Sequence, residues 1–233
     1  MGATNNGAGR TALIAILIAI AAGCGNGSSA GDTAPDTGAG PDETSSTALP
    51  SCGEERRAVA FEIVGALMAA DQDFYDWLAD PSATPQVRPG APELTHAYVD
   101  KGYEIVYVTL APSSLPIGDL VVTDALRQWL DANGFAGGDR TRIFAPAPDD
   151  RIDESAALGI SDEFVRERSE GVTVDYAYGN SEDKILAFQT GGVAPEHVHS
   201  LDEGAGSSGS TAIPGDDLVA HRATVDALPK VCE

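Results

Sequence analysis

The stretch that decides the fold is residues 61–68, Phe-Glu-Ile-Val-Gly-Ala-Leu-Met, which follows the apolar run Ala58-Val59-Ala60. A short apolar run that meets a glycine predicts a buried strand that opens into a turn at Gly65. In an open α/β sheet, the end of such a strand is where ligands and chemistry are usually placed. Glu62 and Val64 therefore stand where we expect a functional site.

Segments with strand and helix character alternate along the chain after this stretch. We expect strands at 103–110, 143–145, 172–178 and 197–201, and helices at 92–101, 123–133, 162–169, 181–189 and 216–228. This alternation predicts a Rossmann-like α/β fold, with a parallel sheet covered by helices on both faces. Residues 65–89 show no clear periodicity and are too few for a large cap, so we expect an open cleft.

The first 23 residues have the pattern of an export signal. Arg10 is followed by the apolar run 12–20, which is too short to span a bilayer, and then by Ala21-Ala22-Gly23-Cys24. This ending resembles the bacterial lipobox, in which the cysteine is lipidated, although Ala21 stands where leucine is usual. We expect a lipoprotein held in the bacterial cell envelope through Cys24, periplasmic or at the cell surface. Plain secretion is the alternative.

Residues 24–51 are rich in Gly, Ser, Thr, Ala, Asp and Pro, a composition typical of a flexible tether. The folded domain is then expected at 52–233. Cys52 and Cys232 lie near its two ends, and an exported protein meets an oxidising compartment. We therefore predict that they form a structural disulfide; two free thiols are the alternative.

The formal net charge of −22 bears on the partners of this chain. Such an acidic protein is repelled by the phosphate backbone of nucleic acids and by anionic lipid surfaces, so neither is expected as a direct partner. The charge favours solubility. A protein partner and a small anionic ligand both stay open.

Several stretches resemble conserved blocks of the haloacid dehalogenase superfamily, in the order and spacing of its lipin-type branch. Residues 61–68 fall where the first block, Asp-x-Asp-x-Thr, should follow a strand. The other matching stretches are Arg88-Pro89-Gly90-Ala91 with 101–109 (second block), Trp129-Leu130 with Gly134-Phe135, and 176–181 with Ala187-Phe188 and Gly191-Gly192 (fourth block). The resemblance covers nearly all of residues 52–232 and implies that family's α/β fold.

The resemblance also implies which positions would carry chemistry. In this family the first aspartate attacks the phosphate, the second protonates the leaving oxygen, and a Thr or Ser after the second strand holds the phosphate. Here those positions hold Glu62, Val64 and Thr109. A glutamate is one methylene too long, and a shift of about 1 Å can lower a rate about a hundredfold. Valine cannot donate a proton.

The fourth block departs from the family pattern at its metal site. Acids there bind Mg²⁺ together with the nucleophile, whereas this chain has Asn180, which the lipin-type branch tolerates, and Lys184 in place of the metal-binding aspartate. A cation at that position should repel Mg²⁺. We predict that Lys184 pairs with Glu62 and stands in for the metal, although a slip of one position would restore an acid, Asp183.

Weaker signals favour ordinary structural interpretations. His197 and His199 alternate on one predicted strand, but two ligands do not make a zinc site, so we interpret them as surface residues. We expect His96 and His221 to be solvated on helices. The acidic stretch of Asp71, Asp73 and Asp76 lacks EF-hand spacing and is predicted to be a solvated loop. No metal site or other cofactor is therefore expected.

Together these observations predict an exported, lipid-anchored domain that has lost phosphatase activity and acts as a binding or interaction module. The first alternative is a Mg²⁺-dependent phosphatase that acts on a phosphate monoester through Glu62 and Asp183. The second is a purely structural envelope lipoprotein.

Overall fold

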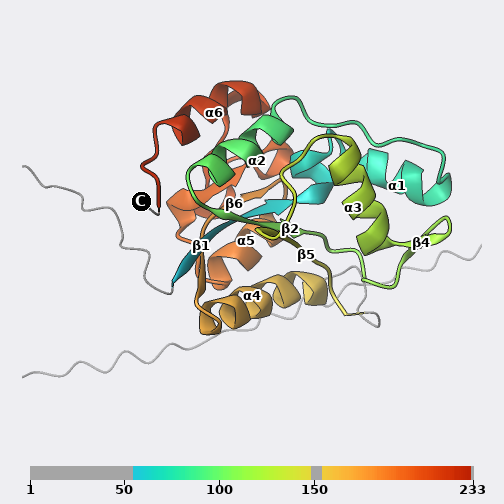
Figure 1. Ribbon diagram of the computed structural model, residues 1–233, viewed down its shortest axis with the longest axis horizontal. Helices are drawn as coiled ribbons and strands as arrows, with labels where there is room; N and C mark the ends of the chain where they lie inside the picture. The colour runs from blue at the N-terminus through green and yellow to red at the C-terminus, as the bar shows by residue number, and fades with distance from the viewer. Residues whose placement is uncertain (1–54, 148–153, 232–233) are drawn as a thin grey trace, which may run out of the picture. The chain divides into compact units, whose positions relative to one another are not determined.

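The computed structural model describes residues 55–147 and 154–231 (Figure 1). The expected signal segment and tether, the expected lipidation site Cys24 and the expected disulfide partners Cys52 and Cys232 lie outside these residues. No helix in the described part is long and apolar enough to cross a membrane.

A six-stranded sheet forms the centre of the domain. Every pair of neighbouring strands is parallel, which confirms the predicted sheet type. In spatial order the strands are β5 (Thr141–Phe144), β2 (Glu104–Val108), β1 (Arg56–Glu62), β6 (Val172–Gly179), β7 (Val198–Ser200) and β8 (Thr211–Ala212). The central strands β1 and β2 are buried almost throughout, as expected for strands covered on both faces.

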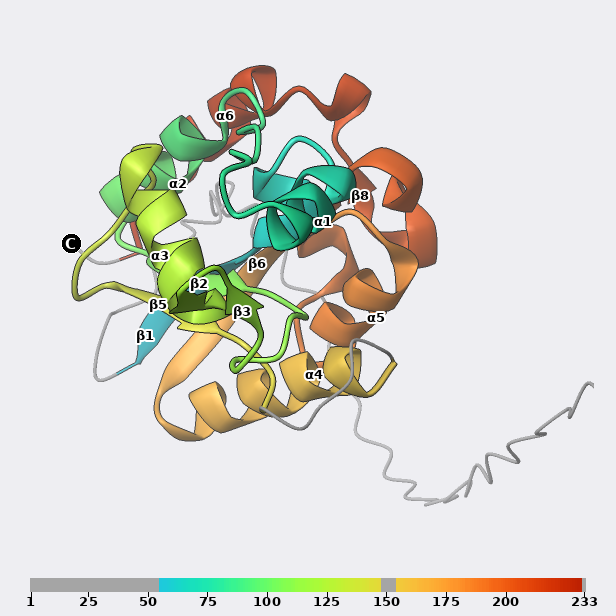
Figure 2. The same ribbon diagram turned by 90° about the vertical axis from the view of Figure 1, so that its right-hand side faces the viewer.

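Helices cover both faces of this sheet (Figures 1 and 2). One face packs against α2 (Ala91–Asp100), α3 (Val122–Ala132) and α6 (Leu218–Asp226), and the other against α4 (Glu154–Ser169) and α5 (Glu182–Thr190). Side chains of β1 alternate between two cores: Val59 and Phe61 face the first group of helices, whereas Ala58 and Ala60 face the second. The Rossmann-like architecture is therefore confirmed.

Short elements join these layers. A turn of π-helix, η1 (Ile63–Leu67), follows β1 and leads to α1 (Asp71–Ala79), which lies at the carboxyl end of the strands, toward the viewer in Figure 2. A small antiparallel hairpin, β3 (Pro116–Ile117) and β4 (Leu120–Val121), precedes α3. Single 3₁₀ turns occupy η2 (Pro195–His197), η3 (Asp202–Gly204), η4 (Ser207–Gly209) and η5 (Pro214–Asp216). None of the elements between β1 and α2 forms a large cap in the described structure.

The predicted strands and helices are present within a few residues of their expected bounds. The structure adds the short strands β3, β4 and β8, where loops were predicted, and differs at two further places. The segment 65–89 contains α1, which the sequence did not reveal because Phe74 is its one fully buried side chain. Helix α4 begins at Glu154, eight residues before the predicted start at 162. Its exposed apolar residues Leu158 and Val165 weaken the amphipathic pattern.

The interpretation of His199 and His221 as surface residues was wrong. His199 is only 7% exposed, and its ring lies 4.8 Å from that of Tyr178 and 4.5 Å from that of His221. The Nε2 atom of half-buried His221 lies 2.9 Å from the Tyr178 hydroxyl oxygen. His199 is buried because it lies on β7, which pairs with β6 and β8 inside the sheet. His96 is exposed, as predicted. The rings of His197 and His199 both contact the ring of Tyr176, which shows that the two histidines share a face.

Burial and the neighbouring imidazoles lower the pKa of His199 to about 3, from an ordinary value of 6.5. The folded state therefore holds this imidazole neutral, while the unfolded chain takes up a proton below pH 6.5. We expect the domain to lose stability as the pH falls from 6.5 toward 3, by about 1.4 kcal/mol per pH unit from this group. In His199→Phe, which keeps the ring contacts, this contribution should be absent.

The measurement is the free energy of unfolding by urea at several pH values, for the wild type, His199→Phe and the exposed control His96→Phe. The control should follow the wild type. Equal pH dependence in the wild type and His199→Phe would contradict the prediction.

Candidate active site

Strands β1 and β6 are parallel neighbours, so their carboxyl ends meet at one edge of the sheet. Phe61 pairs with Tyr178 in the register, which places Glu62, the last residue of β1, beside Asn180, the first residue after β6. Helix α5 begins two residues later and carries Lys184 in its first turn. The topology alone therefore brings these three predicted residues together.

The Glu62 side chain is held by two contacts in a buried position. Its Oε1 atom forms an ion pair with Lys184 Nζ, and the two side chains are only 3% and 12% exposed. Its Oε2 atom accepts a hydrogen bond from the backbone N–H of Asn180, with an oxygen–nitrogen distance of 3.2 Å. The predicted pairing of Lys184 with Glu62 is thus confirmed.

The Asn180 amide is fixed from both ends. Lys184 Nζ donates to its Oδ1 atom at 3.0 Å, while its Nδ2 atom donates to Asp71 Oδ1 at 2.8 Å. Asp71 is therefore part of the site. It is exposed, as predicted, but the prediction that it belongs to a loop was wrong. It is the first residue of α1, where an acidic side chain is favoured by the helix dipole. A helical interpretation of 71–79 would have identified it.

A cavity of about 100 Å³ opens beside the ion pair. Four of the six predicted site residues line it, namely Glu62, Val64, Thr109 and Lys184. The other lining residues are Asp71, Phe74, Tyr75, Leu110 and Ala111. Asp183 is exposed and is not among the residues that line it, so the geometry places Lys184, and not Asp183, at the site.

The backbone around the site requires a glycine at position 65. Gly65 has φ +97, and a Cβ atom on it would lie 1.9 Å from Asn180 Nδ2. The turn is also tied down by Arg88, whose Nη2 atom donates to the Gly65 carbonyl at 2.6 Å and pairs with Asp202 at 2.5 Å. The strand-to-turn transition is thus held rigidly against the residue that contacts Glu62.

The electrostatics of Glu62 are dominated by burial. Burial raises the pKa of its carboxyl group to about 7, from an ordinary value of 4.5, while Lys184 and the Asn180 N–H act in the opposite direction. The Glu62 carboxyl can therefore exchange a proton at neutral pH. Thr109 is buried, and its Oγ1 atom accepts from the Ala111 N–H at 3.1 Å, which leaves the hydroxyl proton free to be donated.

The described residues do not fit a Mg²⁺ site of the kind that the family resemblance implies. The carboxylate that would bind the ion contacts the Lys184 ammonium instead. Within residues 55–147 and 154–231, no group of three or more His, Cys, Asp or Glu side chains is placed to hold a metal ion.

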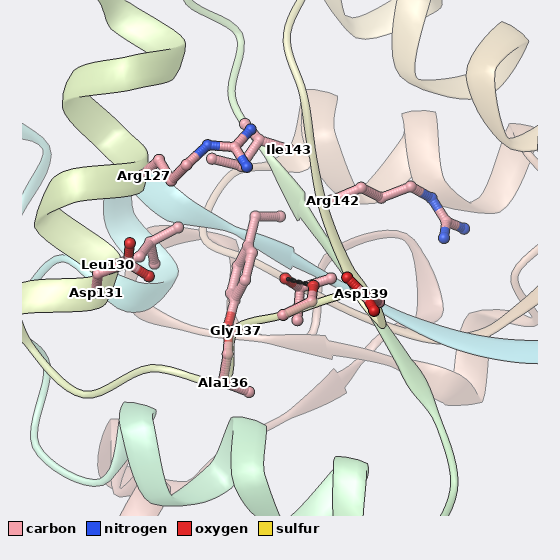
Figure 3. Close-up of a pocket in the computed structure, with 11 residues that line it drawn as sticks. Arg127, Leu130, Asp131, Ala136, Gly137, Asp139, Arg142 and Ile143 are labelled. Carbon is pink, nitrogen blue, oxygen red and sulfur yellow. Dashed lines mark hydrogen bonds between the residues drawn. The ribbon is translucent and has the colours of Figure 1, made fainter.

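Two further cavities lie outside this pocket. One, of about 330 Å³, adjoins the far side of Asn180 and is lined by Ala69, Ala70, Asp71, Asn180, Ser181, Asp202 and Glu203. The other, of about 280 Å³, lies between α3 and β5, where Arg127 and Asp131 border it and Arg142 points away from the other lining residues (Figure 3). None of the predicted site residues lines the cavity in Figure 3, so it is separate from the site.

Comparisons with known proteins agree with the resemblance. The family model described as "PITM 1-3, LNS2 domain" matches residues 59–202, well over half of the chain. Among the solved structures that match is a provisionally assigned HAD-like phosphatase from Mesorhizobium loti, with 16% identity and a TM-score of 0.48 over 78% of this chain and 90% of that one. No curated protein matches the chain.

The raised pKa of Glu62 predicts a pH dependence opposite in sign to that of His199. The folded state binds the proton more tightly than the unfolded chain, so the stability from this group is complete below pH 4.5 and is lost as the pH rises to about 7. Relative to Glu62→Gln, the wild type should lose about 3 kcal/mol across this window.

The free energy of unfolding, measured between pH 4 and about 8, checks this expectation. The exposed Glu93→Gln on α2 is the matched control and should follow the wild type. If the free energies of unfolding of the wild type and of Glu62→Gln changed with pH in the same way, this prediction would be refuted.

Proposed function

Since the chain belongs to the LNS2 domain family, a lipin-like branch of the haloacid dehalogenase superfamily, we propose that it has lost phosphatase activity and acts as a binding or interaction module. We further propose that it is exported, lipidated at Cys24 and held in the bacterial cell envelope by the tether 24–51. The observation that carries the loss of activity is the buried ion pair between Glu62 and Lys184.

This ion pair opposes phosphoryl transfer in two ways. It engages the carboxylate at the nucleophile position, so Glu62 is not free to attack a phosphate. It puts a positive charge where the family binds a metal cation. Phosphoryl transfer depends on positioning and on neutralising oxygen charge, and both are altered here. Val64 adds a third obstacle, because an aliphatic side chain lines the cavity where the proton donor should stand.

The charges of the cavity also bear on its ligand. Glu62 and Asp71 line it with Lys184, which is the one cation among its lining residues and is already paired. A free phosphate in this cavity would lie near the carboxylates of Glu62 and Asp71, and the one cation among the lining residues, Lys184, is already paired with Glu62. This favours a binding role on a surface of the domain, with a protein partner, over capture of a small anion in the vestigial pocket.

One observation favours the alternative of an active phosphatase. Glu62 and Thr109 still line one cavity, in the arrangement that the family uses for its nucleophile and its phosphate-holding residue. Asp183, which this alternative also needs, is exposed and outside the lining. The geometry therefore supports the alternative less well.

The test is Mg²⁺-dependent hydrolysis of p-nitrophenyl phosphate by the purified full chain. A triple variant, Glu62→Asp, Val64→Asp and Lys184→Asp, restores the family's residues and serves as the revived control. We expect the wild type to show no turnover above background and the triple variant to show turnover that depends on Mg²⁺, because an aspartate in place of Glu62 would regain the shorter reach of the nucleophile. Asp183→Asn is the matched control and should behave as the wild type.

Turnover by the wild type that Glu62→Ala abolishes would overturn the proposed loss of activity and establish the phosphatase. Silence in the wild type together with activity in the triple variant would show that the fold is intact and the chemistry was lost.

A further inference from the structure

Three side chains of the site form a group that the proposed function does not use for binding. Lys184 Nζ contacts both Glu62 Oε1 and Asn180 Oδ1, so an amine, a side-chain amide and a carboxyl group meet at one point. All three are largely shielded from water: Glu62 is 2% exposed, Asn180 is 8% exposed, and the Lys184 side chain is 12% exposed.

We propose that Lys184 forms a covalent isopeptide bond with Asn180, with Glu62 as the proton carrier and ammonia as the leaving group. This inference rests on the proposed function in one respect, since Lys184 must occupy the site in place of a metal. It adds a modification that would close the vestigial site permanently.

The orientation of the Asn180 amide suits the attack. Because Asp71 Oδ1 accepts from Nδ2 at 2.8 Å, the amide oxygen faces the lysine, whose Nζ donates to Oδ1 at 3.0 Å and so stays beside the amide group. Groups held next to one another in this way react faster than the same groups free in solution. Asn180 precedes α5 and Lys184 lies in its first turn, so one short segment carries both reactants.

The reaction balances with these groups alone. Glu62 takes a proton from the Lys184 ammonium, and the free amine attacks the Asn180 side-chain carbonyl carbon. Glu62 then returns the proton to the amide nitrogen as the carbon–nitrogen bond to Nδ2 breaks. An ammonium and a neutral primary amide thereby become a secondary amide and an ammonium ion, with no oxidant or reductant. A carboxyl group that exchanges protons near neutral pH is suited to this role.

The surroundings of Asn180 provide an exit for the ammonium ion. The residues that line the cavity of about 330 Å³ beside Asn180 include Asp71, Asp202 and Glu203. Asp202 is paired with Arg88, whereas Glu203 is exposed, and Asp71 already accepts a hydrogen bond from the nitrogen that leaves. The leaving group is thus released toward solvent through an acidic opening.

The test is digestion of the denatured full chain with endoproteinase Lys-C, followed by mass spectrometry. The lysines of the chain are Lys101, Lys184 and Lys230, so an unmodified chain yields fragments 102–184 and 185–230. A blocked Lys184 should instead yield an intact 102–230 fragment, lighter by the mass of one ammonia. Denaturation removes any protection of the cleavage site by folding.

Variants identify the bond. Asn180→Ala should restore cleavage after Lys184, and Glu62→Gln should slow bond formation about a hundredfold or more, so that cleavage is also largely restored. Asp183→Asn, next to the lysine, is the matched control and should remain uncleaved. Lys184→Arg should yield a 102–230 fragment of full mass.

Three outcomes would overturn the proposal. The first is complete cleavage after Lys184 in the wild type. The second is an ammonia loss that persists in Lys184→Arg, which would indicate a succinimide at Asn180, and the third is a loss of water with a cross-link to the fragment that contains Glu62. The proposed function is judged separately, by phosphate hydrolysis, and a cleaved Lys184 would leave it standing.

Discussion

The buried contact between Glu62 and Lys184 is the constraint on which the rest of the site depends. Two opposite charges taken out of water are costly unless each has further partners, and leaving one unpaired costs more. Here the partners come from Asn180, whose backbone N–H meets the carboxylate and whose side-chain oxygen meets the ammonium. The neighbouring turn is shaped to allow this, since Gly65 leaves room for the Asn180 amide and Arg88 holds the Gly65 carbonyl.

The residues at the site are consistent with one another as a set. A lysine in place of an acid provides a positive charge beside Glu62 without a metal. Under the proposed loss of activity a proton donor at position 64 has no reaction to serve, and Val64 packs with the apolar residues that line the cavity. The framework does not depend on these residues because β1, β2 and β6 are fixed by their own apolar faces. Scaffold and site are thus separable, and a shared fold does not fix a shared chemistry.

The sequence was sufficient for the sheet, most helices and the pairing of Glu62 with Lys184. Apolar strands and glycine stops are local signals, and the ends of neighbouring parallel strands must meet. It was insufficient for Asp71 and His199. Asp71 belongs to a helix with one buried residue, so no periodicity marked it. His199 looked exposed because short strands have little pattern, and its burial depends on β7 pairing with β6 and on the helix that carries His221.

A fixed lysine differs from a metal ion in one physical respect. A bound cation stabilises its site by an amount that grows with the logarithm of its concentration, so a metal-dependent site weakens where the ion is scarce. Lys184 is part of the chain, so its contacts with Glu62 and Asn180 are present at any ion concentration. The same permanence removes the exchangeable cation that phosphoryl transfer needs. The constancy of this site and the lack of a metal-binding carboxylate at position 184 therefore have the same origin in Lys184.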